Sequence, residues 1–141
     1  MTATTEVRLD VAPLPAPRPR FRTIRTKAGK TIASAYSPAN YRDWKQEAEA
    51  LLLQALSDAF EPYTGPVMCR CEFVIKRPKK TVRVAPAGDV DNYVKALLDA
   101  MTKADVWKDD DQVTSLVATK RWTNEGEEPH ILFTLKEAPA P

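Results

Sequence analysis

The sequence is poor in the residues that build common metal and redox sites. It contains two cysteines, Cys69 and Cys71, and one histidine, His130, among 141 residues. Two thiolates are too few for a structural zinc site made of cysteine alone, and a single histidine adds little. The cysteines lie two positions apart, which places both on one face of a strand. We therefore expect both thiols to be small buried side chains, and we expect no catalytic role for His130.

Long hydrophobic runs are also missing. No apolar segment approaches the roughly 20 residues that span a bilayer, and the first ten residues lack the basic and then apolar pattern of a secretory signal. We therefore expect a cytoplasmic protein without a membrane segment. Hydrophobic residues make up 43% of the chain and charged residues 28%, which suits one globular domain over residues 1–141.

Charges of opposite sign are segregated along the chain, although the formal net charge is only +2. Two stretches contain cations and no acid, whereas residues 89–111 contain seven aspartates and three lysines. Basic arms around an acidic centre suit a polyanion that is cut at a cation site, and ordinary solvated surface is the alternative for either basic run. The candidate DNA-binding cations are Arg18, Arg20, Arg22, Arg25, Lys27 and Lys30 in the first run and Lys76, Arg77, Lys79, Lys80 and Arg83 in the second, with Lys120 and Arg121 as further candidates.

Hydrophobic periodicity predicts an α+β fold. A helical stripe predicts one helix from Ser37 and Pro38 to about Phe60, and a second begins near Asp91 or Asn92 and ends before Trp107. The prolines between positions 13 and 19 favour an extended, basic, proline-rich loop over residues 12–37, with a turn at Gly29, and we expect a flexible tail at residues 137–141. Alternation predicts four strands, over residues 7–11, 67–76, 113–122 and 131–135. The expected order is strand, helix, strand, helix, strand, strand, an α/β sandwich in which two helices cover a small mixed sheet.

The second predicted helix has an apolar side and a charged side. Asp91, Lys95 and Asp99 follow one another at i, i+4 spacing and share the charged side. Asp89 lies two positions before Asp91, and an extended backbone would point both carboxylates the same way. Asp110 opens the next strand after a short loop, which can return it to this pair. The buried side is marked by Val94, Leu97, Leu98 and Met101.

Converging carboxylates of this kind suit a divalent metal ion. Mg²⁺ prefers oxygen ligands, often one or a few carboxylates with waters and a substrate phosphate, and the cation relieves repulsion between the acids. Lys95 can orient a carboxylate, stabilise charge on a phosphate or assist proton transfer, and the sequence leaves these roles open. The structural alternative also stands: Asp91 or Asp89 caps the helix, Lys95 and Asp99 form a surface ion pair, and residues 109–111 form a solvated turn.

A longer composite pattern resembles the RusA family of Holliday-junction resolvases, the crossover junction endodeoxyribonucleases. That family's signature is Asp-x-Asp-Asn, a lysine four residues after the second Asp, an Asp four residues further on, and then Asp-Asp-x-Gln. Every part occurs in order between residues 89 and 113. Weaker similarity extends to the basic N-terminal loop and to residues 41–43. The matching runs are Gly88-Asp89-Val90-Asp91-Asn92, Lys95-Ala96, Leu98-Asp99-Ala100-Met101, Trp107 and Asp109-Asp110-Asp111-Gln112-Val113.

The resemblance implies a homodimer that binds four-way DNA junctions and nicks two strands symmetrically during DNA recombination and repair. It implies Mg²⁺ as the cofactor, with Mn²⁺ able to substitute, and such enzymes are common in phages and prophages. The family's metal-binding catalytic acids correspond to Asp89, Asp91 and Asp110, and its catalytic lysine to Lys95. Secondary family positions correspond to Asn92, Asp99 and Asp109.

Two other functions stay open on the sequence. The basic stretches also suit a non-catalytic DNA-binding module of phage or prophage origin, which would bind DNA in a salt-sensitive way without cutting it. A Mg²⁺ phosphotransfer enzyme for small nucleotides is the other, although the chain lacks a Gly-x-x-x-x-Gly-Lys phosphate loop. The proline-rich stretch at residues 13–19 and the charged turn at residues 125–128 depart from the family pattern and leave the cleavage-sequence preference open.

Overall fold

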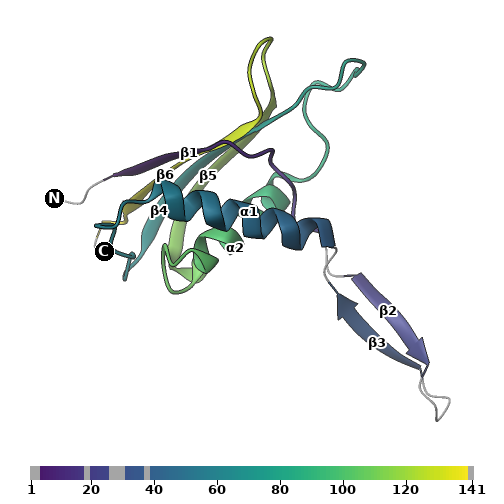
Figure 1. Ribbon diagram of the computed structural model, residues 1–141, viewed down its shortest axis with the longest axis horizontal. Helices are drawn as coiled ribbons and strands as arrows, with labels where there is room; N and C mark the ends of the chain where they lie inside the picture. Colours follow the sequence, from purple (N-terminus) through teal and green to yellow (C-terminus); the bar gives the residue numbers. More distant parts are fainter. Residues whose placement is uncertain (1–3, 18–19, 26–30, 37–38, 140–141) are drawn as a thin grey trace.

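A computed structural model describes residues 4–17, 20–25, 31–36 and 39–139 (Figure 1). A four-stranded sheet has the order β1-β6-β4-β5. β4 runs parallel to β5 and antiparallel to β6, and β1 is antiparallel to β6. Helices α1 and α2 pack on one face of this sheet, so the predicted mixed sheet covered by two helices is confirmed. The elements are β1 (Thr5–Leu9), α1 (Ala39–Ala55), β4 (Val67–Ile75), α2 (Val90–Lys103), β5 (Val113–Trp122) and β6 (His130–Glu137).

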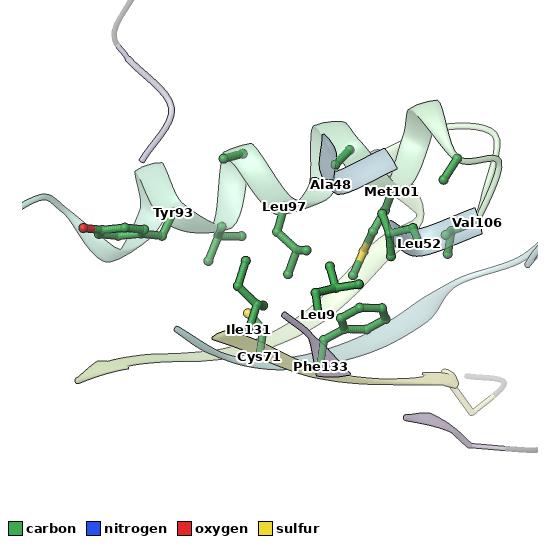
Figure 2. Close-up of a cluster of buried hydrophobic side chains, with 14 of the residues drawn as sticks. Leu9, Ala48, Leu52, Cys71, Tyr93, Leu97, Met101, Val106, Ile131 and Phe133 are labelled. Atoms are coloured by element: carbon green, nitrogen blue, oxygen red, sulfur yellow. The ribbon is translucent and has the colours of Figure 1, made fainter. Parts of the chain in front are cut away.

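The core lies between the two helices and the sheet (Figure 2). Leu97 and Met101 of α2 lie in one buried cluster with Leu52 of α1 and with Ile131 and Phe133 of β6. Burying a side chain of this size stabilises the fold by about 1.5–3 kcal/mol relative to leaving it exposed. The apolar side of α2 therefore fixes the rotation of this helix on the sheet.

The central strand β4 alternates as its sequence predicts. Cys69 and Cys71 point into the core at 3% and 2% exposure, together with Val67 and Phe73. Both thiols are free and buried, which confirms the expectation that they act as small core side chains. His130 is also buried, and its Nδ1 lies 2.8 Å from the carbonyl oxygen of Glu128.

The prediction that all of residues 12–37 form a loop is wrong, because two parts of this extended segment are strands. β2 (Arg20–Arg25) and β3 (Thr31–Tyr36) form an antiparallel hairpin, which lies apart from the main sheet beyond the start of α1 in Figure 1. The helix therefore follows three strands, not one. The sequence Arg-Phe-Arg-Thr-Ile-Arg contains residues suited to a strand. A strand prediction depends on alternating apolar residues, and three arginines among six residues make that alternation hard to recognise.

The ends of two elements also differ from the predictions. α1 ends at Ala55 instead of near Phe60, because Ser57 and Asp58 favour turns over helix and the Phe60 amide bonds the Ser57 carbonyl at 2.9 Å. β6 continues to Glu137, and the Ala138 amide donates to the Pro66 carbonyl at 2.9 Å, so residues 137 and 138 are held against the sheet. The predicted helix start at residues 37–38 lies outside the described residues. None of the helices within the described ranges is long and apolar enough to cross a membrane.

The seating of α2 gives a stability prediction. Leu97 is fully buried, whereas Leu53 on α1 is 57% exposed. We expect Leu97→Ala to lower the free energy of unfolding by about 2–5 kcal/mol, because the substitution leaves a cavity in the core. Leu53→Ala, the matched control, should change it by no more than about 0.5 kcal/mol. Equal effects of the two substitutions in chemical denaturation would contradict this packing.

Candidate active site

The loop after β4 delivers Asp89 to the start of α2. Asp89 occupies the N-cap position with extended backbone (φ −77°, ψ 138°), and its side chain makes no capping hydrogen bond to the helix. Asp91 lies in the first helical turn and is exposed. The sequence suggested that both acids lie on one extended segment. The structure differs, because Asp89 is extended and Asp91 is helical. Asp89 thus takes the N-cap position, as one alternative had it, but without a side-chain capping hydrogen bond to α2.

Asp99 is held between two partners, one on its own helix and one on α1. The Tyr41 hydroxyl donates to Oδ2 of Asp99 at 2.8 Å, and Lys95 Nζ lies 3.1 Å from Oδ1. The Asp99 side chain is 27% exposed and that of Lys95 63%. Burial and the Asp99 carboxylate together raise the pKa of Tyr41 above its ordinary value, so the phenol stays protonated and remains a donor. The predicted Lys95–Asp99 ion pair is thus present, and Tyr41 contacts the same carboxylate.

Asp110 lies beside the same pair. Partial burial is the main cause that raises the pKa of its carboxyl group above the ordinary value, the Lys95 ammonium opposes this, and Asp109 and Asp99 add to it. The 3₁₀ turn η1 (Asp110–Gln112) contacts α2, and this contact brings Asp110 within electrostatic reach of Lys95 and Asp99. The loop after α2 therefore returns Asp110 to the charged side of that helix, as the sequence predicted.

Asp109 and Gln112 hold the short 3₁₀ turn η1 (Asp110–Gln112) in place. The Asp109 carboxylate accepts from the Asp111 amide at 2.9 Å, and Gln112 Oε1 accepts from the Asp109 amide at 3.2 Å, which forms a capping box. Gln112 Nε2 also donates to the carbonyls of Tyr63 and Gly65 at 2.9 and 3.1 Å. Asp109 is thus engaged as a cap, whereas its neighbour Asp110 is presented toward α2.

The chain between α2 and η1 is fixed by a buried aromatic residue. Trp107 is 1% exposed, and its Nε1 donates to Thr102 Oγ1 at 2.8 Å. Asp105 adopts the left-handed conformation (φ 58°) that turns the chain out of the helix, a conformation that Asp tolerates better than most residues. This turn sets the position from which Asp110 faces Lys95.

The acidic side chains do not surround one point as the ligands of a preformed metal site would. Asp110 is within electrostatic reach of Lys95 and Asp99, Asp91 lies one turn before Lys95 on the same side of the helix, and Asp89 precedes the helix at its N-cap. Within the described part of the chain, no three acidic, thiol or imidazole side chains gather closely enough to hold a metal by themselves. The donors present are carboxylate oxygens, which fit Mg²⁺, an ion that often takes few protein ligands and completes its shell with waters and substrate phosphate.

The cations of the second basic run are exposed in the loop after β4. Of the cations in the first run, Arg20, Arg22 and Arg25 belong to β2, and Arg18, Lys27 and Lys30 lie outside the described residues. Arg121 is occupied by ion pairs with Glu127 and Glu72 at 2.6 and 3.4 Å. The exposed lysines and arginines of the second run are Lys76, Arg77, Lys79, Lys80 and Arg83, and none of them forms an ion pair with another described residue.

Sequence analysis missed the contacts that fix these groups. Residues 41–43 were noted for their weaker similarity to the family, and Tyr41 among them proves to bond Asp99. Gln112 was noticed as part of the Asp-Asp-x-Gln motif without a role, and it proves to tie η1 to the loop before β4. Lys120 was a candidate DNA contact, and its ammonium instead binds backbone carbonyls next to Asp89.

The Tyr41–Asp99 hydrogen bond predicts that a tyrosine hydroxyl stabilises the fold more when its acceptor is charged than when its acceptor is neutral. We expect Tyr41→Phe to lower the free energy of unfolding by about 1.5–3 kcal/mol, because it removes a hydrogen bond to a carboxylate. Tyr63→Phe is the control, since Tyr63 shares a 2.8 Å hydrogen bond with the neutral hydroxyl of Thr5, and it should cost about 1 kcal/mol. If urea denaturation showed no extra cost for Tyr41→Phe, the Asp99 contact would contribute no more than an ordinary one.

Comparison with known proteins adds a family to this geometry. The family model described as Endodeoxyribonuclease RusA matches residues 10–132, which is most of the chain and includes every acid discussed above. No curated protein matches the chain. With the RusA signature carried by a charged helix face and the adjoining 3₁₀ turn, the chain belongs to the RusA family of DNA-cutting, Holliday-junction-resolving endonucleases.

Proposed function

We propose that this protein is a Mg²⁺-dependent endonuclease that resolves four-way DNA junctions by paired, symmetric nicks. The observation that carries this proposal is that the turn η1, which bears Asp110, contacts α2, whose charged side carries Asp91, Lys95 and Asp99. In the family that the chain belongs to, this signature belongs to DNA nucleases. Asp89, Asp91 and Asp110 are the proposed metal ligands, and Mn²⁺ substitutes for Mg²⁺.

The residues around the acids set the protonation and orientation of the reacting groups. A bound Mg²⁺ would lower the pKa of a coordinated water and polarise the phosphoryl oxygens. Lys95 pairs its ammonium with Asp99 and is within electrostatic reach of Asp110, where it can offset the negative charge that develops on the scissile phosphate. Asp99 holds this ammonium, and the Tyr41 hydroxyl holds Asp99 in turn. The lysine is therefore oriented from α1 without a direct contact between Tyr41 and DNA.

The surface around the acids supports binding to a polyanion. The exposed cations of the loop after β4 belong to the same loop that leads to Asp89, and we propose that they bind phosphates of the strand that is cut. The hairpin of β2 and β3 carries three further arginines, Arg20, Arg22 and Arg25. We propose that both elements contact the backbone of the junction, which fixes its register without reading base sequence.

A homodimer is part of the proposal because a four-way junction must be cut on two strands. Two-fold symmetry would present one active site to each strand, and coordinated cuts would follow from one binding event. A monomer would release junctions that are nicked on one strand only.

Cleavage of a plasmid that extrudes a cruciform tests the proposal directly. With Mg²⁺, coordinated cuts by a dimer should give linear DNA, whereas single cuts give nicked circles. Asp91→Asn and Asp110→Asn should retain junction binding and lose at least about 100-fold in cutting rate, since each removes a charged metal ligand. Asp111→Asn is the matched control, because Asp111 is exposed and next to Asp110, and it should cut within about threefold of the wild type.

Several outcomes of that assay would contradict the proposal. Binding of the junction without cutting under any divalent ion would favour the DNA-binding module. Equal cutting by Asp110→Asn and the wild type would remove Asp110 from the ligand set. Nicked circles as the final product would contradict the proposal of paired cuts, and the argument for a dimer would fail with it.

The basic loop gives a separate binding prediction. We expect Lys79→Glu with Lys80→Glu to weaken junction binding and to reduce the slope of log affinity against log salt by about 0.9 for each lost phosphate contact. Lys136→Glu is the control, because Lys136 is equally exposed but lies near the end of β6 on the main sheet. An unchanged salt slope in the double variant would show that the loop is ordinary surface.

A further inference from the structure

The three residues before Asp89 each have their carbonyl oxygen held by a side chain. Lys120 Nζ donates to the Pro86 carbonyl at 2.7 Å and also to the Gly88 carbonyl. The Tyr93 hydroxyl donates to the Ala87 carbonyl between them at 3.0 Å. The segment has no helix or strand of its own, so these contacts take the place of the backbone ladder that fixes a regular element.

The same segment has little freedom to shift. Gly88 has a φ of +91°, and a Cβ built there would lie 3.2 Å from the Tyr93 ring. A side chain at this position would be strained for both reasons. At the other end of the motif, the Asp89 carbonyl accepts from the Asn92 amide at 3.0 Å, which starts α2. The backbone of Asp89 is therefore fixed on both sides of the residue.

Lys120 reaches this segment from β5, far from it in the sequence. It lies on β5, where its Cα is paired with Phe73 of the central strand. Trp122, two positions further along, donates Nε1 to the Arg83 carbonyl at 3.0 Å. Alternate residues of a strand share a face, so two side chains from one face of β5 fasten the loop that leads to Asp89.

These contacts favour a structural use of the Lys120 charge over a DNA contact. A lysine ammonium has three donors, and two of them are directed at the Pro86 and Gly88 carbonyls. By contrast, Lys79 and Lys80 are exposed and have no ion pair with another described residue. Phosphate binding by Lys120 would require its ammonium to leave the backbone of the segment that presents Asp89.

We propose that Lys120 is a positioning residue of the active site, which keeps Asp89 ready to bind a divalent cation by holding the Pro86 and Gly88 carbonyls. The inference rests on the proposed role of Asp89 as a metal ligand. Without the ammonium, the segment at residues 86–88 gains conformations in which the Asp89 carboxylate is displaced. Metal binding must then order the loop as well, and this added cost lowers affinity.

Metal binding without DNA tests this role. Lys120→Met keeps the apolar stem and removes the donors, Lys120→Arg keeps charge and donors, and Lys136→Met is the control on an exposed lysine. Titration with Mn²⁺ alone, followed by electron paramagnetic resonance, should show affinity about tenfold lower for Lys120→Met, as is typical when an outer partner of a metal ligand is lost. Lys120→Arg should recover part of that loss, and Lys136→Met should match the wild type.

A second pair of measurements separates positioning from DNA contact and from misfolding. Junction affinity without metal, and its salt slope, should stay within about twofold for Lys120→Met, whereas a lost phosphate contact would lower the slope by about 0.9. Amide hydrogen exchange of residues 87–92 should accelerate in this variant while exchange in β4 and β6 stays unchanged. Faster exchange in every strand would mean global destabilisation and would overturn the specific role.

The experiments distinguish a failure of the role proposed for Lys120 from a failure of the proposed function. Unchanged Mn²⁺ affinity of Lys120→Met, in a protein whose Asp89→Asn variant does lose affinity, overturns the role of Lys120 alone. Unchanged Mn²⁺ affinity of Asp89→Asn overturns the proposed ligand set and, with it, this inference. Unchanged hydrogen exchange at residues 87–92 in Lys120→Met overturns the inference whatever the metal titration shows.

Discussion

The burial of one side of α2 against the sheet determines where the acids lie. Leu97 and Met101 are fully buried, and a helix held by such contacts cannot rotate without exposing them. Because Asp91, Lys95 and Asp99 are spaced at i, i+4, the same contacts direct all three to the opposite side. The apolar core therefore sets the geometry of the charged surface, and the buried Tyr41 contacts it directly through its hydrogen bond to Asp99.

The charged side of α2 is completed by residues from other elements. Tyr41 of α1 holds Asp99, Gln112 holds the turn that presents Asp110, and Lys120 of β5 holds the loop before Asp89. Each of these contacts is made from a helix or strand of the α/β layers or from the adjoining 3₁₀ turn, so the groups proposed for catalysis depend on rigid supports. Such supports reduce the ordering that a metal ion or a DNA phosphate would otherwise have to impose.

The parts of this arrangement that depend on local periodicity could be predicted from the sequence. The two-sided pattern of α2 and the buried alternation of β4 are examples, because neighbouring residues alone decide them. The hairpin of β2 and β3 could not, since its cations mask the apolar pattern. The tie from Lys120 to Gly88 joins residues 32 positions apart, and it follows only from the parallel pairing of β5 with β4. The short loop after α2 was enough to predict that Asp110 returns toward this helix. Nothing in the sequence indicated Tyr41 as the partner of Asp99, because this contact joins two different helices.

The central claim is that the acids of α2 and η1 form one cation site. Paramagnetic broadening of backbone amide signals by substoichiometric Mn²⁺ measures this most directly, because the effect falls steeply with distance from the ion. The account predicts that signals from residues 89–95 and 109–111 broaden together, while those of Arg70, Val117 and Thr134, which line a hollow on the sheet elsewhere, keep their intensity. Broadening at only one of the two acidic segments, or equal broadening across the sheet, would contradict the claim.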